Sequence, residues 1–162
     1  ETDEILRTHW KILRDTSKRG YTNEKIIEQL KNRDNDSKKY IYPQKNFADL
    51  VINFFPIESF SPGKKDANIN IGLKIDINAS IYLENLVESL KSDSMSWDYN
   101  DDLNFQYIIL KEPPLNDFKT LAFNTIENLS EIADVNAKWA KGYDGFIYYL
   151  CLKIISEKLK ED

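Results

Sequence analysis

The sequence predicts an α/β fold, α+β within this chain, with a small, mixed and mainly antiparallel sheet of about four strands packed by helices. Short apolar or alternating segments bounded by turn residues indicate strands near residues 47–55, 69–77, 95–99 and 103–111. Longer segments with apolar residues at helical spacing indicate helices near residues 2–19, 79–91, 116–129 and 143–160. The 162 residues are enough for one domain with a hydrophobic core.

The predicted strands differ in their burial. Residues 50–55 form an apolar run closed by Pro56, which indicates a buried strand. Residues 69–77 alternate between apolar and polar, which indicates a half-buried strand. The last two strands read as a hairpin around residues 100–102. A tight turn explains the acidic residues near this hairpin, so we expect no metal site there.

The predicted helices have clear end signals. Thr2 can cap the first helix, Gly20 can end it, and Thr22 can cap a second one. We expect residues 33–39 to form a polar loop because they lack periodicity. Residues 146–152 are apolar on nearly all sides of the last helix, which predicts deep burial.

The first predicted helix carries one apolar and one strongly charged face. At 100° per residue, the charged residues fall within an arc of about 140°. They are Lys11, Arg14, Asp15, Lys18 and Arg19. Asp15 lies four residues from both Lys11 and Arg19, so it can bridge to either. Such a face suits an oxygen-rich anion, most simply a phosphate, because an arginine fork can bind one with two hydrogen bonds. A solvated charged face is the alternative.

Two other residues of this helix are given structural roles. His9 is the single histidine of the chain and borders the apolar arc, so we expect a partly buried structural side chain. Trp10 is expected to anchor the helix in the core.

Composition limits the classes of partner. The formal net charge of −5 disfavours nucleic acid and anionic membrane surfaces, and no apolar stretch is long enough to span a bilayer. Cys151 is the single cysteine, so no internal disulfide can form, and we expect a cytoplasmic setting. The chain begins at Glu1 and not at Met, from which we expect a piece of a longer polypeptide.

Three blocks of the chain carry a resemblance to a known family. They are Trp10-Lys11-Ile12 with Arg14-Asp15 and Arg19-Gly20-Tyr21-Thr22; Tyr40-Ile41-Tyr42-Pro43-Gln44 with Ala48-Asp49-Leu50-Val51-Ile52; and Trp139 with Gly142 and Gly145-Phe146-Ile147. In order and spacing the chain resembles the C-terminal half of the phosphoribulokinase and uridine kinase-like family over nearly its whole length. Members of that family are ATP-dependent kinases that phosphorylate a hydroxyl of a sugar phosphate or a nucleoside.

The resemblance implies roles for five residues. Lys11 would stabilise the charge of the transition state. Asp15 would orient both Lys11 and Arg19. Arg14 and Arg19 would bind the phosphate of the acceptor. Gln44 would touch substrate, and it is otherwise explained as part of a turn into the next strand. Residues 1–36 would form a helical, lid-like arm, and residues 37–162 the C-terminal α/β domain.

The chain itself contains no nucleotide-binding loop. A P-loop needs Gly, four residues, and then Gly-Lys-Ser/Thr, and none of the five glycines fits. The resemblance implies that ATP and Mg²⁺ are bound by a separate N-terminal P-loop domain of the intact enzyme, and we expect no cofactor on this chain alone. A pentose phosphate is the preferred acceptor, and a nucleoside is the alternative. A non-catalytic dimerisation or docking module remains the competing interpretation, and a homodimer is compatible with both.

Overall fold

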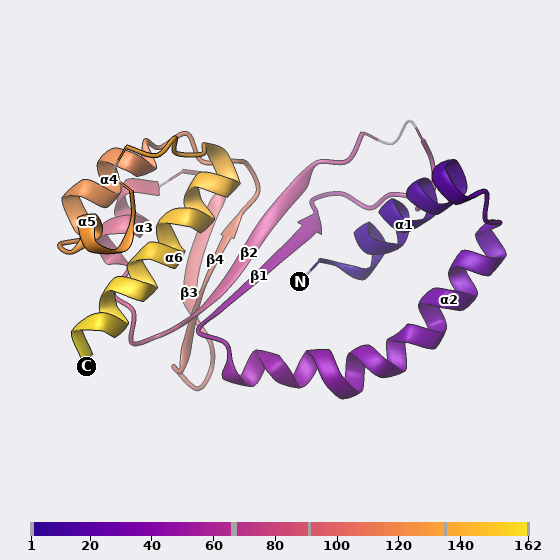
Figure 1. The fold of residues 1–162 in the computed structure, drawn as a ribbon, viewed down its shortest axis with the longest axis horizontal. Helices are drawn as coiled ribbons and strands as arrows, with labels where there is room; N and C mark the ends of the chain where they lie inside the picture. The colour runs from indigo at the N-terminus through magenta and orange to yellow at the C-terminus, as the bar shows by residue number, and fades with distance from the viewer. Residues whose placement is uncertain (1, 66–67, 91, 135, 162) are drawn as a thin grey trace. The chain divides into compact units, whose positions relative to one another are not determined.

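Helical elements begin and end the chain, and two pairs of strands separated by one helix lie between them. The structure, a computed structural model, describes residues 2–65, 68–90, 92–134 and 136–161. The chain forms two compact units, Glu1–Lys74 and Ile75–Asp162. Four strands form one sheet in the order β1-β2-β4-β3, which confirms the predicted fold class (Figure 1). The strands are β1, Leu50–Pro56; β2, Ile71–Asn78; β3, Met95–Tyr99; and β4, Phe105–Leu110. The division into an arm and a domain after residue 36 stays a prediction.

Helix α1, Glu4–Arg19, begins later than expected. Thr2 forms a parallel bridge with Phe54 of β1, and the Asp3 N–H donates to the Phe54 carbonyl at 2.8 Å. The Asp3 carboxylate therefore caps the helix by accepting the Ile5 N–H at 2.9 Å. The predicted end is confirmed, because Gly20 has a left-handed conformation with φ +64°.

Helix α2, Asn23–Asp36, runs further than the sequence indicated. The Thr22 hydroxyl caps it as predicted, accepting the Lys25 N–H at 3.4 Å. The polar loop expected at residues 33–39 is wrong, because the chain continues into the π-helical turn η1, Ser37–Ile41. An ion pair of 2.6 Å between Asp34 and Lys38, four residues apart, supports this continuation.

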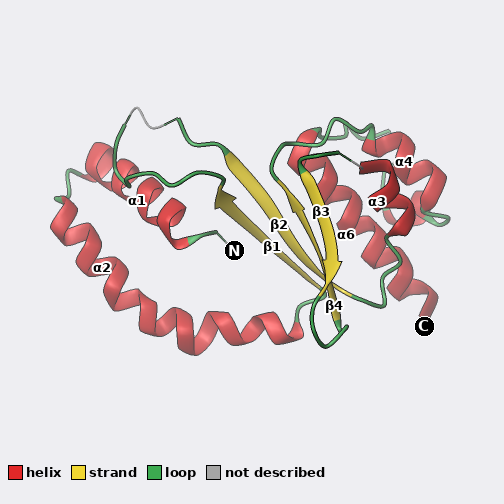
Figure 2. Cartoon of the chain, turned by 180° about the vertical axis from the view of Figure 1, so that it is seen from behind, coloured by secondary structure: helices red, strands yellow, loops and turns green. Residues whose placement is uncertain are grey.

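The segment that contains Gln44 is helical as well. Residues Tyr42–Phe47 form the 3₁₀ turn η2, so Gln44 does not lie in a simple turn leading into the strand. Its amide Nε2 donates to the Tyr40 carbonyl at 2.8 Å, which extends the helical hydrogen-bond pattern by one side chain. Figure 2 shows α2, η1 and η2 as one curved helical stretch that returns to β1.

The first two strands have less uniform burial than their composition suggested. Every residue of β1 is half-buried, so the expected fully buried strand is wrong. In β2, Leu73, Ile75 and Ile77 are buried and the intervening residues are half-buried, which confirms the predicted alternation. A Cβ on Gly72 would lie 2.5 Å from the Phe55 ring, so this glycine lets β1 and β2 approach closely.

In the second unit the predicted hairpin is confirmed. β3 pairs antiparallel with β4 in a register from Met95↔Leu110 to Tyr99↔Gln106. Helix α3, Glu84–Leu90, begins later than residue 79 because residues 78–81 form a turn, with the Asn78 side chain accepting the Ser80 N–H at 2.9 Å. Lys91, the expected last residue of this helix, lies outside the described residues.

The helix predicted at residues 116–129 is divided in two. Helix α4, Phe118–Thr125, ends because Ile126 is extended with φ −119° and ψ 101°. The short α5, Leu129–Ile132, follows. The last helix, α6, spans Gly142–Glu161 and agrees with the prediction.

Aromatic rings form the centre of the core of the second unit. Phe118 of α4 lies 5.8 Å from Phe146 and 6.2 Å from Tyr149, measured between ring centroids, and all three are buried. The Tyr149 hydroxyl is satisfied by Thr125 at 2.9 Å. The deep burial expected of residues 146–152 is confirmed for Phe146, Tyr149, Leu150 and Leu152, whereas Tyr148 is 37% exposed. Helix α6 packs against α4 and α5, and the Tyr148 ring meets Trp139 edge-on with centroids 4.9 Å apart.

Candidate anion-binding site

Asp15 is the centre of a charged cluster near the C-terminal end of α1. Its side chain is fully buried, and Oδ1 accepts a 2.8 Å hydrogen bond from Arg14 Nε. Arg19 Nη1 lies 3.5 Å from the same oxygen. The side chains of Arg14 and Arg19 are 53% and 56% exposed. One buried carboxylate oxygen therefore anchors two guanidinium groups that still reach solvent.

Hydrogen bonding in this cluster favours the charged forms of both Asp15 and Arg14. The hydrogen bond from Arg14 lowers the pKa of Asp15, although burial acts in the opposite direction. The same bond raises the pKa of Arg14 above its ordinary value. With Asp15 ionised, Arg14 and Arg19 leave one net positive charge at the surface. Such a group can bind a phosphate through charge-assisted hydrogen bonds.

Lys11 points from the same helix toward α2. It is 9% exposed, and its Nζ donates to Gln29 Oε1 at 3.1 Å. The pKa of Lys11 is lowered, first by burial and then by the positive charge of Arg33. Of the two bridges open to Asp15, the one to Arg19 is formed; among the described ion pairs Asp15 also pairs with Arg14, and not with Lys11.

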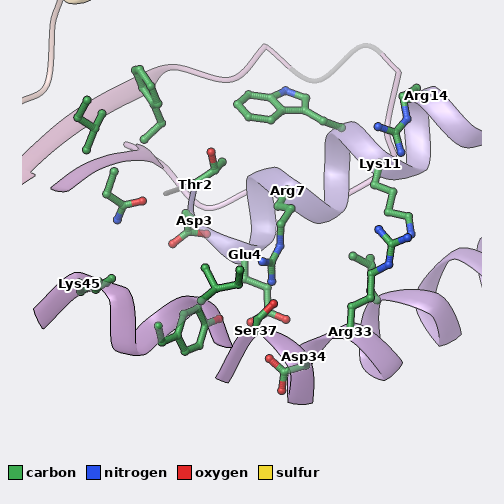
Figure 3. A pocket seen from close by; sticks show the side chains of 17 residues that line it. Thr2, Asp3, Glu4, Arg7, Lys11, Arg14, Arg33, Asp34, Ser37 and Lys45 are labelled. Atoms are coloured by element: carbon green, nitrogen blue, oxygen red, sulfur yellow. The ribbon is translucent and has the colours of Figure 1, made fainter. Parts of the chain in front are cut away.

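A cavity of about 1070 Å³ lies within the first unit, between α1, the curved stretch of α2, η1 and η2, and β1. Figure 3 shows the side chains of Lys11 and Arg33 pointing toward one another across it. Basic side chains outnumber acidic ones in its lining: Arg7, Lys11, Arg14, Arg33 and Lys45 against Asp3, Glu4 and Asp34. The cavity is therefore suited to an anionic group.

Among the described residues, two that line this cavity have a buried polar atom without a partner, and Oδ2 of the neighbouring Asp15 also lacks one. Arg7 Nε and Asn53 Oδ1 are buried without a hydrogen bond, and both residues line the cavity. Buried polar groups without partners are rare in proteins, because each one costs desolvation free energy. A bound ligand with both an anionic oxygen and a hydroxyl group would satisfy both atoms.

The structure brings most of the predicted site residues together. Lys11 and Arg14 line the cavity, and Asp15 fixes Arg14 beside it. Arg19 joins the cluster through Asp15. Gln44 is exposed and is not among the described residues that line the cavity. Its amide donates to the Tyr40 carbonyl instead.

Sequence reasoning missed two cations of the cavity. Arg7 lies four residues before Lys11, so helical spacing could have placed it on the same side of α1. Arg33 fell within the loop predicted at residues 33–39. No pattern in that segment indicated that it faces Lys11, because the facing depends on how α2 folds back on α1.

Of the two aromatic residues of α1 expected to pack, the structure buries His9 and exposes Trp10. His9 is 4% exposed, and its Nδ1 accepts the Gly63 N–H at 3.0 Å, which confirms a structural role. Its ring meets Phe60 edge-on with centroids 5.2 Å apart. Trp10 is 43% exposed and lines the cavity, so the prediction of a core anchor is wrong. Leu6 and Ile12 occupy the buried side of the helix instead.

Known proteins share the part of the chain that contains this cluster and this cavity. Residues 1–61 match the sequence model of the Phosphoribulokinase / Uridine kinase family. The cavity-lining residues all fall within this range. The expected resemblance of residues 139–147 lies outside the match and stays a prediction, as does the assignment of the chain to the C-terminal half of such a kinase.

Three curated relatives are phosphoribulokinases. One from Synechocystis sp. is 41% identical over 56 residues, which cover 35% of this chain and 17% of the relative. A chloroplastic one from Mesembryanthemum crystallinum is 38% identical over 60 residues, covering 37% of this chain and 15% of the relative. A chloroplastic one from Spinacia oleracea is 45% identical over 49 residues, covering 30% of this chain and 12% of the relative. The similarity thus spans less than a fifth of each relative's length.

The described residues contain neither a metal-binding group nor a membrane-spanning helix. They contain no group of three or more His, Cys, Asp and Glu side chains that could hold a metal ion. Within the same residues, no helix has both the length and the apolar character needed to cross a membrane.

Proposed function

We propose that this chain belongs to an ATP-dependent, phosphoribulokinase-like enzyme that transfers the γ-phosphoryl group of ATP to a hydroxyl of a pentose phosphate. The observation that carries the proposal is the pair of guanidinium groups held on buried Asp15 beside a cation-lined cavity. These residues lie in the segment that matches the kinase family. We propose a cytoplasmic setting, because a chain with a single cysteine forms no internal disulfide.

In this proposal each charged residue has one task. Arg14 and Arg19 bind the phosphate that the acceptor already carries, since both are anchored and half exposed. Asp15 positions them. Lys11 faces the cavity and neutralises charge on the phosphoryl group during transfer. Gln44 is the least supported member, and its contact with substrate would require the amide to leave the Tyr40 carbonyl.

The proposal assigns ATP and Mg²⁺ to a P-loop domain of the intact protein. The sequence has no P-loop pattern, and the cavity has a cationic lining that fits phosphate oxygens better than a metal ion. When bound in that domain, Mg²⁺ would offset charge on the phosphates of ATP. In this proposal the residues of this chain bind and orient the acceptor.

A nucleoside is the alternative acceptor. It carries no phosphate for Arg14 and Arg19 to bind, so the geometry of the cluster favours a sugar phosphate. A second candidate function is a non-catalytic docking or dimerisation module. The exposed apolar side chains of η1 and η2 favour that candidate, since Tyr40 is 57% and Phe47 is 89% exposed.

A phosphotransfer screen of the intact protein tests the proposal. ATP labelled on the γ-phosphate is offered with pentose phosphates and, in parallel, with nucleosides. We expect label transfer to a pentose phosphate, and loss of that transfer in the triple variant Lys11→Ala, Arg14→Ala and Arg19→Ala. Transfer to nucleosides alone would overturn the assigned acceptor. No transfer to any acceptor would favour the docking module.

A further inference from the structure

Gln29 connects the two helices of the candidate site. It lies on α2, is half-buried, and its Oε1 accepts the 3.1 Å hydrogen bond from Lys11 Nζ on α1. The contact joins residues 18 positions apart, so it depends on the way α2 folds back on α1. Nothing in the sequence of α2 distinguishes this glutamine from other polar residues of the helix.

The surroundings of Lys11 explain why its acceptor matters. The charged groups that act on it are Arg33 from α2 and Asp15, Arg14 and Arg19 from α1. Three of these four groups are cations, and the carboxylate is already paired with two of them. Lys11 is 9% exposed as a residue, and its ammonium has a neutral amide as its described hydrogen-bond partner.

An amide and a carboxylate would have different effects at this position. An ammonium has three N–H donors, and one bond to an amide oxygen fixes its direction while leaving two donors for a ligand. A carboxylate at the same place would also fix the direction, but its negative charge would cancel the attraction for an incoming anion. The neutral partner therefore fixes the direction of the Lys11 ammonium without cancelling its charge.

We propose that Gln29 is a positioning residue that holds the Lys11 ammonium toward the cavity without neutralising it. The inference deepens the proposed kinase function and rests on it for its kinetic consequences. The hydrogen bond itself, and its effect on Lys11, do not depend on the reaction.

The kinetic test is a double-mutant cycle in the intact protein. Gln29→Leu removes the acceptor at similar volume, and we expect kcat to fall about 2- to 10-fold with little change in KM for the acceptor. Gln29→Glu pairs Lys11 with a charge, and we expect at least about a tenfold fall in kcat. Glu28→Gln, an exposed change on the same helix, is the matched control and should leave kcat unchanged.

The cycle itself gives the decisive comparison. If Gln29 acts through Lys11, then Gln29→Leu added to Lys11→Ala should cause no further loss of kcat. Multiplicative losses in the double variant would overturn the inference, because they would mean that Gln29 acts independently of Lys11.

A second measurement does not need activity. The lysines are methylated with ¹³C, the Lys11 resonance is assigned by its absence in Lys11→Arg, and its titration is followed by NMR. We expect the pKa of Lys11 to rise in Gln29→Glu, because a carboxylate favours the ammonium, and to fall in Gln29→Leu. Unchanged titration in both variants would overturn the inference. If the titrations shift as expected and no phosphotransfer is found, the proposed function fails and the Lys11–Gln29 contact stands.

Discussion

Replacing Arg14 with alanine isolates one anchored guanidinium of the proposed acceptor site. A hydrogen bond to a charged group contributes about 1.5–3 kcal/mol in general. The side chain of Arg14 is 53% exposed, so solvent screens its contact with a phosphate and the lower end of that range applies. We therefore expect the KM for a pentose phosphate to rise about tenfold, with a smaller change in kcat.

The assay is steady-state phosphotransfer by the intact protein at varied acceptor concentration. Lys18→Ala is the matched control, because it removes one exposed cation from the same helix without touching Asp15. Arg14→Lys keeps the charge but loses the fork, so its KM should lie between the wild-type and alanine values. Equal effects of Arg14→Ala and Lys18→Ala would refute the reasoning, because they would reduce the cluster to a general electrostatic effect.

Three other changes test separate parts of the structure. Lys11→Ala should lower kcat more than it raises KM, since its charge is assigned to the transferring phosphoryl group; steady-state kinetics with the opposite pattern would reassign Lys11 to substrate binding. Asp15→Asn should remove the part of the unfolding free energy that depends on ionisation of the Asp15 carboxyl. The pKa of Asp15 is lowered in the folded protein, so its ionised form stabilises the fold above about pH 4, and this contribution is lost as the pH falls through the lowered pKa. Urea denaturation should therefore give a difference between wild type and Asp15→Asn that shrinks below about pH 4, and a constant difference would contradict the ion pair. Phe146→Ala should cost roughly 3–5 kcal/mol of unfolding free energy, because the ring is fully buried against Phe118; a wild-type denaturation midpoint would mean that α6 is not central to the core.

Local sequence signals predicted most of the secondary structure. Gly20 ends α1 and Thr22 caps α2 because each signal acts on the backbone within a few residues. The hairpin of β3 and β4 was found for the same reason. The predictions failed where a distant segment intervened. Thr2 could not cap α1 because it pairs with Phe54 of β1, 52 residues away.

The candidate site was predicted only in part. Helical spacing gathered Lys11, Arg14, Asp15 and Arg19 on one side of α1, and the structure keeps them in one region. It did not indicate that Asp15 and Lys11 are buried, because a polar residue at a given helical angle carries no signal of what covers it. Trp10 shows the opposite error, since its size suggested burial and its side chain lies on the cavity.

The sequence by itself determined most of the order of helices and strands, the charged face of α1 and the glycine that ends this helix. These features follow from backbone preferences and side-chain periodicity within a few turns of helix. Only the tertiary structure decided that α2 returns along α1, that Gln29 and Arg33 face Lys11, and that a cation-lined cavity lies between them. The physical reason is that contacts between residues 18 or more positions apart depend on packing, and one sequence read alone contains no measure of that packing.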